Sequence, residues 1–287
     1  VLGHKVTVIN NCEETKQIDG VSWIDIKSIK KTDEFDFVIA NGDCRLFKYA
    51  KSNKNILFSH SLQSIEKFLR KKQLISYMKY KPKVCFISNY HQKNRSKLLY
   101  IFGHIHLRWS VDELFLRSNL SSEIDNNLAI FTSRPDRNLE LLINIWTNSI
   151  IKMRRNSKLL VTDNNFIYKN SSISKRKLGN QKDLLRDLLK ARICLLPGHK
   201  SELFCLAAEE ARELCIPIIT LGLGCLGERV EHNTTGFIAK NEHEFANYTL
   251  KLFSDDELWN RLRLNLIKKR KTNTWKKVAE QLIDQLY

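Results

Sequence analysis

Short β-branched runs alternate with amphipathic helical stretches along this chain, and the alternation occurs in two blocks. The first block predicts strands at 5–10, 22–26, 37–40, 56–59 and 84–88, a weaker strand near Ile105, and helices at 62–78 and 92–101. Alternating strands and helices are typical of parallel sheets that carry helices on both faces. The chain is therefore predicted to be an α/β protein.

A polar stretch at 117–127, RSNLSSEIDNN, is typical of a linker between the two blocks. The alternation then resumes with strands at 128–132, 158–162, 193–196, 217–221 and 236–239 and helices at 137–153, 181–191, 202–214, 242–253, 256–269 and 274–286. A length of 287 residues fits two domains. We predict domains at 1–118 and 119–270, and a C-terminal helix at 271–287 that is able to pack back on the first domain. Two doubly wound domains would face each other across a cleft, and ligands of such sheets bind beyond the carboxyl ends of the strands.

The segment SELFCLAAEEARELCIPIITLG carries two glutamates, Glu202 and Glu210, within one predicted helix. Eight residues advance about 12 Å along a helix and turn through about 800°, so the two carboxylates would lie within about a quarter turn of each other. The helix N-terminus would offer free N–H groups and a partial positive charge to a phosphate. This arrangement suits a long polar ligand, with one carboxylate on sugar hydroxyls and the other on a ribose diol. The alternative is an amphipathic helix whose acidic residues, Glu209 and Glu213 among them, face the solvent.

The same segment resembles the signature of the family 4 retaining glycosyltransferases of GT-B fold. It matches that signature at Glu202, Phe204, Leu206, Glu210, Ala211, Pro217 and Ile218, and it departs from it at Cys205 and Cys215, where glycine is usual. Four other segments resemble the family in the same order along the chain: GHKVTVI, WSVDELF, FTSRPDRNLELLINIW and GCLGERVEHNTTGFIA.

The resemblance implies a GT-B fold of two Rossmann-like domains. We expect the first domain to lack its first strand, because the sequence opens on the tail of an element. It also implies that Glu202 contacts the hydroxyls of a donor hexose and that Glu210 contacts the ribose. The N–H groups near Cys205 and Leu206 would face the diphosphate or the hexose, and Phe204 belongs to the same donor-binding segment. Cys205 narrows that approach, because a side chain points where none is usual.

Arg134 and Arg137 lie in the loop that follows the strand at 128–132. Guanidinium groups suit phosphate oxygens, and fixed cations stabilise the charge that grows on a leaving nucleoside diphosphate. The resemblance implies this role, because the family uses a basic pair from this loop. Here the loop is shorter and Asn138 replaces the usual glycine. Two solvated loop arginines are the alternative.

His60 follows the strand at 56–59, and a polar residue at the carboxyl end of a parallel strand points to the cleft. A histidine in a comparable place of the family lies near the acceptor. The resemblance therefore implies that His60 assists removal of the acceptor proton or steadies its charge. The alternative is a hydrogen-bonded structural histidine.

No metal and no cofactor are predicted. The sequence contains no Asp-x-Asp triplet and no histidine pair at zinc spacing with a third ligand in view. The run GLGCLG matches the GxGxxG pattern of dinucleotide-binding proteins, but that pattern needs a long helix after it. The strand at 236–239 follows too soon and leaves room for only a short turn of helix. A glycine loop that approaches the donor sugar fits better.

A net charge of +17 favours polyanionic partners such as nucleic acid, anionic lipid headgroups or phosphorylated substrates. Residues 1–118 hold 21 Lys and Arg and 11 Asp and Glu, a net charge of +10, and the segment EKFLRKKQLISYMKYKPK concentrates this charge. A basic, partly aromatic helix suits an anionic membrane surface. No recognised nucleic-acid motif accompanies the charge, so nucleic acid is not an expected partner. A solvated basic surface without a partner is the simplest alternative.

The seven cysteines are scattered and form no CxxC pair, which is typical of reduced thiols in a cytoplasmic protein. No apolar run approaches the 18 residues of a membrane span, and no signal peptide is recognised. We expect a cytoplasmic protein that is able to associate with the inner face of a membrane.

The resemblance implies a hexosyltransferase-type enzyme of class EC 2.4. It would move a sugar from a nucleoside-diphosphate-sugar donor to a glycan or lipid-linked acceptor in surface polysaccharide or lipopolysaccharide assembly. The resemblance implies front-face attack with retention of configuration, in which the departing phosphate assists deprotonation of the acceptor. Two alternatives stay open: a non-catalytic GT-B-like binding protein, favoured by Cys205 and Cys215, and a basic nucleic-acid-binding protein.

Overall fold

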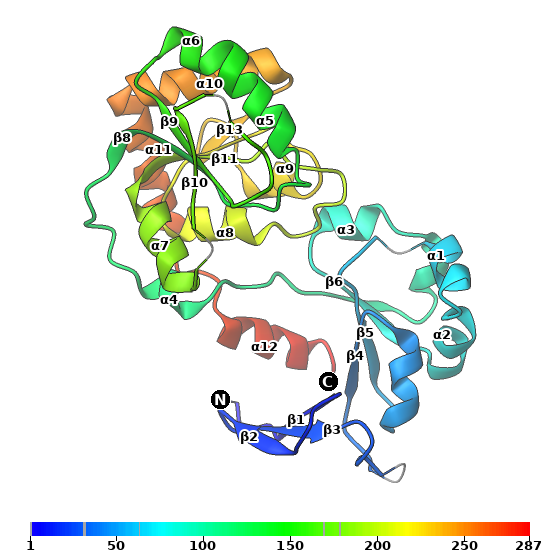
Figure 1. The fold of residues 1–287 in the computed structure, drawn as a ribbon. Coiled ribbons are helices and arrows are strands. Elements are labelled where there is room, and N and C mark those ends of the chain that lie inside the picture. The colour runs from blue at the N-terminus through cyan, green and yellow to red at the C-terminus, as the bar shows by residue number, and fades with distance from the viewer. Residues whose placement is uncertain (1, 31–32, 63, 169, 178) are drawn as a thin grey trace. The chain divides into compact units, whose positions relative to one another are not determined.

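The structure is a computed structural model that describes residues 2–30, 33–62, 64–168, 170–177 and 179–287. It divides into two compact units (Figure 1). The first consists of Val1–Arg108 together with Lys276–Tyr287, and the second of Trp109–Trp275. None of the helices in the described part of the chain has the length and apolar character that crossing a bilayer requires.

The second unit is built on one parallel sheet of six strands in the order β10-β9-β8-β11-β12-β13. The strands are β8 (Asp125–Phe131), β9 (Lys158–Val161), β10 (Ile173–Lys175), β11 (Ala191–Leu195), β12 (Ile218–Thr220) and β13 (Gly236–Ile238). From β8 the chain first builds outward on one side and then, from β11, on the other. The carboxyl ends of β8 and β11 are therefore neighbours at the switch point of the sheet, where open α/β sheets bind ligands.

Helices cover both faces of this sheet, as the alternation of strands and helices predicts (Figure 1). On one face pack α5 (Leu139–Ile145), its continuation through a π turn (Trp146–Ile150) into α6 (Ile151–Met153), and α10 (Glu242–Ser254), which leads into α11 (Asp256–Lys269). On the other pack α4 (Glu113–Arg117), α7 (Gln181–Lys190) and α8 (Leu206–Glu213). Trp146 is fully buried, and its indole donates to Ser172 Oγ at 2.9 Å.

One predicted helix begins later than expected. The sequence predicted a helix at 202–214, but α8 begins only at Leu206. Cys205 has a left-handed backbone, with φ 60° and ψ 80°, which a helix cannot include. Glu202 therefore lies in the loop before α8 and Glu210 lies on it. The prediction that both glutamates share one helix was wrong.

The first unit contains two sheets. A parallel sheet has the order β4-β5-β6-β7, and a separate three-stranded sheet has the order β1-β3-β2. The strands are β1 (Val6–Asn10), β2 (Lys16–Ile18), β3 (Val21–Asp25), β4 (Val38–Asn41), β5 (Asn55–Phe58), β6 (Lys83–Phe86) and β7 (His104–His106). The antiparallel strand β2 was not predicted, because its three residues are all exposed and carry no apolar pattern.

The four-stranded sheet has apolar residues on both faces. Leu57 and Val84 belong to one cluster, which packs under α1 (Ile65–Arg70), α2 (Leu74–Tyr80) and the 3₁₀ helix η1 (Cys44–Tyr49). Ile56 and Cys85 point to the other face, because side chains alternate along a strand. That face is covered by α12 (Trp275–Asp284) and the residues after it, with Val278 and Leu286 in the cluster.

Two predicted helices of the first unit are broken. The predicted helix at 62–78 is divided into α1 and α2 by Lys72, whose backbone is left-handed with φ 53°. The predicted helix at 92–101 is replaced by α3 (Asn89–Lys93) and a 3₁₀ helix η2 (Lys97–Tyr100). The remaining predicted strands and helices are present within a few residues of their expected bounds.

Candidate functional site

Two loops at the switch point of the second unit carry most of the predicted donor-binding residues. The loop between β8 and α5 carries Arg134 and Arg137, and the loop between β11 and α8 carries Glu202, Phe204 and Cys205. The sequence predicted both loops, because each follows a strong apolar strand. The structure brings the two loops into direct contact.

The central contact is an ion pair between Arg137 and Glu202. Arg137 Nε lies 3.1 Å from Glu202 Oε2, and the two side chains are only 15% and 14% exposed. The two groups attract each other as an ion pair but form no hydrogen bond, because Glu202 Oε2 has no hydrogen-bond partner within the described residues. Arg134 is different: its side chain is 69% exposed and contacts Asp136 at 3.2 Å. Asp136 also binds Arg137, at 2.7 Å, so it joins the two predicted arginines.

Asn138 is a site residue whose role the sequence left open. It has a left-handed backbone with φ 63°, as a glycine there would, and asparagine tolerates this conformation better than most residues. Its side chain donates from Nδ2 to Gly198 O at 2.5 Å. Asn138 therefore keeps the backbone path of the usual glycine and also links the β8–α5 loop to the β11–α8 loop.

The Cys205 thiol lies inside the site, beside Glu202. Cys205 is only 4% exposed, and burial together with the Glu202 charge raises the pKa of its thiol well above the ordinary value. Burial also raises the pKa of Glu202, against the opposing charges of Arg137 and Arg134 and a hydrogen bond from Cys205. A buried, neutral thiol beside the Glu202 carboxyl group thus lies where the family usually has glycine.

Phe204 is 5% exposed and makes three contacts that fix its position, two with Arg229 and one with Trp109. Its carbonyl accepts from Arg229 Nε at 3.0 Å, and the Arg229 guanidinium lies 4.5 Å from the centre of its ring. The Trp109 ring lies 5.5 Å away on another side. Arg229 is itself fixed by buried Glu209, 3.2 Å from its Nη1. This network holds the backbone just before α8, whose first residue, Leu206, is 48% exposed. Arg229 was not predicted, and the alternative in which Glu209 faces the solvent is wrong, because Glu209 is buried.

The glycine run after β12 supports the Glu202 loop. Gly224 has φ +66°, and a Cβ at this position would lie 2.4 Å from His199 O and 2.7 Å from Glu202 O. Glu202 O accepts from Cys225 N at 2.9 Å. The helix that follows, α9 (Leu226–Arg229), has four residues, which confirms the predicted short turn of helix.

Glu210 lies on α8 in a poorly solvated place. Burial raises the pKa of its carboxyl group from 4.5 to about 7, and the charge of Arg176 opposes this shift. Arg176 is 8% exposed and follows the carboxyl end of β10, where its Nε lies 3.3 Å from Asp187 Oδ2. Arg176 was not predicted, because the short strand β10 before it was not predicted either; the basic run in ISKRK was a usable signal.

His60 belongs to the first unit, just beyond the carboxyl end of β5. Its imidazole Nε2 contacts Asn41 Oδ1 at the end of β4, and its ring centre lies 5.9 Å from that of Phe58. His60 is exposed. The polar residues beyond β4 and β5 therefore meet at one edge of this sheet, as expected for parallel strands.

Across the described residues, no group of three His, Cys, Asp or Glu side chains is placed to hold a metal ion. Arginine and glutamate side chains lie next to each other at the switch point, and this combination suits a ligand that carries both phosphate and hydroxyl groups. That the activity needs no metal stays a prediction.

Comparison with known families identifies the second unit. The model of the family described as Glycosyl transferases group 1 matches residues 126–271, which is half of the chain. The chain belongs to this family. The matched residues include both loops of the switch point, α8 and Arg176. No curated protein matches the sequence.

Solved structures of similar fold extend the comparison to the first unit. A TarM G117R mutant from S. aureus is 15% identical with a TM-score of 0.69, over 91% of this chain and 57% of that chain. WaaG, a glycosyltransferase involved in lipopolysaccharide biosynthesis, is 14% identical with a TM-score of 0.66, over 99% of this chain and 91% of that chain. Anabaena Alr3699/HepE is 12% identical with a TM-score of 0.64, over 88% and 78%. The chain spans just over half the length of TarM. The likeness confirms the predicted GT-B fold class with two Rossmann-like sheets.

Proposed function

We propose that this group 1 glycosyltransferase is a retaining hexosyltransferase that takes its sugar from a nucleoside-diphosphate donor, as family 4 enzymes do. The observation that carries the proposal is the largely buried Arg137–Glu202 pair at the switch point. A paired cation and carboxylate at the mouth of a doubly wound sheet suit a ligand that joins a diphosphate to a sugar. Solved structures of similar fold contain a nucleoside diphosphate together with a separate sugar-containing molecule: UDP with alpha-GlcNAc-glycerol in TarM, and UDP with glucose in HepE.

Each predicted donor residue has a role in this proposal. Arg137 and the exposed Arg134 bind the diphosphate, together with the free N–H groups at the start of α8 next to Cys205 and Leu206. Glu202 accepts hydrogen bonds from the hexose hydroxyls.

Glu210 accepts hydrogen bonds from the ribose diol, and Arg176 holds part of it ionised. Phe204, fixed by Arg229, sets the position of the backbone between these groups.

The proposed reaction breaks the bond between the hexose C1 and the phosphate oxygen and forms a bond from C1 to the acceptor oxygen on the same face. The bonding electron pair leaves with the diphosphate, whose growing charge the two arginines stabilise. The acceptor proton goes to the departing phosphate oxygen. His60 steadies the acceptor hydroxyl during this step.

The proposed acceptor is a glycan or a lipid-linked glycan of surface polysaccharide or lipopolysaccharide assembly. Exposed apolar side chains on α1 and α2 support contact with a membrane: Leu69 is 57% exposed, Ile75 83% and Met78 48%. Arg70 and Lys79 on the same helices suit anionic headgroups. We propose a peripheral protein at the cytoplasmic face.

The experiment is donor binding and hydrolysis with UDP-glucose, UDP-GlcNAc and GDP-mannose. We expect calorimetric binding of one donor, slow hydrolysis of it, and at least about tenfold weaker binding in Arg137→Ala and Glu210→Ala, because each removes a charged hydrogen bond. Arg155→Ala is the matched control, since Arg155 is an exposed arginine of the same unit outside the site. Equal binding in all three variants would refute the site.

A second candidate function is a GT-B protein that binds a donor without turning it over. The buried Cys205 thiol at the Glu202 carboxyl group favours it, because the thiol takes space and a hydrogen-bond position that a sugar would use. Binding without hydrolysis in the wild-type chain, and hydrolysis in Cys205→Gly, would establish this second function.

A further inference from the structure

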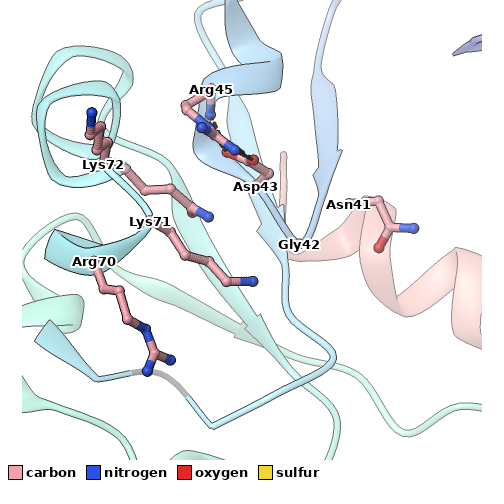
Figure 2. A pocket seen from close by; sticks show the side chains of 8 residues that line it. Asn41, Gly42, Asp43, Arg45, Arg70, Lys71 and Lys72 are labelled. Atoms are coloured by element: carbon pink, nitrogen blue, oxygen red, sulfur yellow. Dashed lines mark hydrogen bonds and ion pairs between the residues drawn. The ribbon is translucent and has the colours of Figure 1, made fainter. Parts of the chain in front are cut away.

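A cavity of about 390 Å³ lies in the first unit at the carboxyl end of β4 (Figure 2). The loop after β4 forms one wall and the turn between α1 and α2 forms the other. The polar and charged groups of its lining that matter here are Asn41, Asp43 and Arg45 from the loop and Arg70, Lys71 and Lys72 from the turn. None of these residues belongs to the predicted donor site.

Asp43 is the only carboxylate among the lining residues; Arg45 binds it directly, and the charge of Lys71 acts on it from farther away. Arg45 Nη2 donates to Asp43 Oδ2 at 2.6 Å, Arg45 Nε donates to Oδ1 at 3.1 Å, and the Arg45 backbone N–H donates to Oδ1 at 2.8 Å. Within the described residues, no carboxylate lies within ion-pair distance of the three cations of the turn. The cavity therefore has an excess of uncompensated positive charge.

The neighbouring Lys67 responds to this excess. Burial lowers the pKa of its ammonium group, and the charges of Lys71 and Arg70 lower it further. Lys67 donates to Ser61 Oγ instead of reaching a carboxylate. Like charges are thus crowded around the turn, at a cost that a bound anion would remove.

The two walls of the cavity are fixed to each other. Gln73, which is 3% exposed, accepts through Oε1 from Cys44 N at 3.3 Å and so joins the turn to the loop. The turn itself is closed by Gln73 N, which donates to Phe68 O at 2.8 Å, and by the left-handed Lys72 with φ 53°. The side chains of Lys71 and Lys72 extend from the turn toward the loop that carries Asp43 (Figure 2). The positions of the lysines are therefore set by hydrogen bonds within the chain and do not depend on a bound ligand.

The cavity adjoins the predicted acceptor side of the enzyme. Asn41, which lines it, contacts the His60 imidazole through its Oδ1. We propose that the cavity binds a phosphate ester carried by the acceptor, so that the enzyme glycosylates a phosphorylated acceptor whose reacting hydroxyl lies at His60. The three uncompensated cations of the turn match the two negative charges of a phosphate dianion better than they match the one charge of a carboxylate. This inference rests on the proposed function for the role of His60, while the phosphate site depends on the first unit alone.

The experiment compares two double variants of the full chain. Lys71→Gln/Lys72→Gln removes two cations of the cavity and keeps the length of the side chains. Lys16→Gln/Lys48→Gln removes two exposed lysines of the same unit that do not line the cavity. The probes are glucose 6-phosphate, glucose, and vesicles of phosphatidylglycerol or phosphatidylcholine, measured by calorimetry and by co-sedimentation. UDP-glucose binding is measured in parallel as the report on the donor site.

We expect glucose 6-phosphate, but not glucose, to bind the wild-type chain, and the cavity variant to bind it at least about tenfold more weakly. The control variant should bind as the wild-type chain does, and UDP-glucose affinity should be equal in all three. If phosphatidylglycerol vesicles bind in the same cavity-dependent way and glucose 6-phosphate does not, the phosphate is carried by a lipid. Equal losses in both variants, or no binding of either phosphate probe, would overturn the inference. Failure to bind any of UDP-glucose, UDP-GlcNAc and GDP-mannose would overturn the proposed function and leave the phosphate site standing.

Discussion

The raised pKa of Glu210 makes the stability of the second unit depend on pH. Burial raises the pKa of this carboxyl group from 4.5 to about 7, so the folded chain holds the proton more tightly than the unfolded chain does. The neutral form therefore favours folding. This contribution is complete below about pH 4.5 and is lost as the pH rises through about 7. A shift of this size corresponds to about 3 kcal/mol of unfolding free energy, at 1.36 kcal/mol per pKa unit.

The perturbation is Glu210→Gln, which keeps the shape of the side chain and cannot titrate. Urea unfolding of both chains, followed by circular dichroism near pH 5 and near pH 8, gives the difference in unfolding free energy at each pH. We expect this difference to change by about 3 kcal/mol in favour of the glutamine variant at the higher pH. Parallel pH dependences in the two chains would refute the reasoning, because they would mean that the carboxyl group titrates as a solvated one.

Protonation of Glu210 competes with the binding of a ribose diol to its carboxylate. A carboxylate accepts two hydroxyl hydrogen bonds, whereas the neutral acid donates one of its own. With a pKa of about 7, the ionised fraction of Glu210 rises about tenfold between pH 6 and pH 8, and UDP-glucose affinity should rise by about the same factor. Calorimetry of Glu210→Gln, in which this rise should be absent, is the control.

Three further predictions concern the loops around the site. Asn138→Ala should lower the unfolding free energy by about 1–2 kcal/mol, and Asn138→Gly by less, because glycine adopts φ 63° freely; equal urea midpoints would contradict this. Glu209→Gln should cost about 3 kcal/mol, since it leaves the buried Arg229 short of its counter-charge; a loss below about 1 kcal/mol would show the pair to be dispensable. Gly224→Ala should cost more than about 2 kcal/mol and weaken UDP-glucose binding, since its Cβ would meet His199 O at 2.4 Å; wild-type thermal stability would disprove the close approach.

Local patterns along the chain were enough to predict most strands, the two-block organisation and the two loops of the switch point. The β-branched run of β12, Ile218–Thr220, is buried at every residue, and its composition alone marks it as a strand of a covered sheet. The position of Arg134 and Arg137 in the loop after β8 followed from the same reasoning, since residues that come after such strands gather at one edge of a parallel sheet. Glu202 and Glu210 were selected by their spacing and by the resemblance, and their placement on one helix was wrong.

The pairing of side chains depended on contacts between distant segments. The late start of α8 comes from the left-handed Cys205, in a loop that packs against the glycine run at Gly224. The predicted helix 62–78 is divided at the left-handed Lys72, and the next residue, Gln73, accepts a hydrogen bond from Cys44, 29 residues away. Periodicity predicts a continuous helix in both places, because it contains no information about such partners.

The second apolar face of the first sheet shows the same division between local and distant information. Apolar residues of β5 and β6 point alternately to the two faces of the sheet, so both faces need to be covered. The helices that are near in sequence cover only one of them. The other is covered by Val278 and Leu286 from the end of the chain. Composition and periodicity thus establish an α/β chain with parallel strands and a polar switch point. The partner of each charged or apolar side chain depends on which distant segments meet in space, and that is a property of the folded chain.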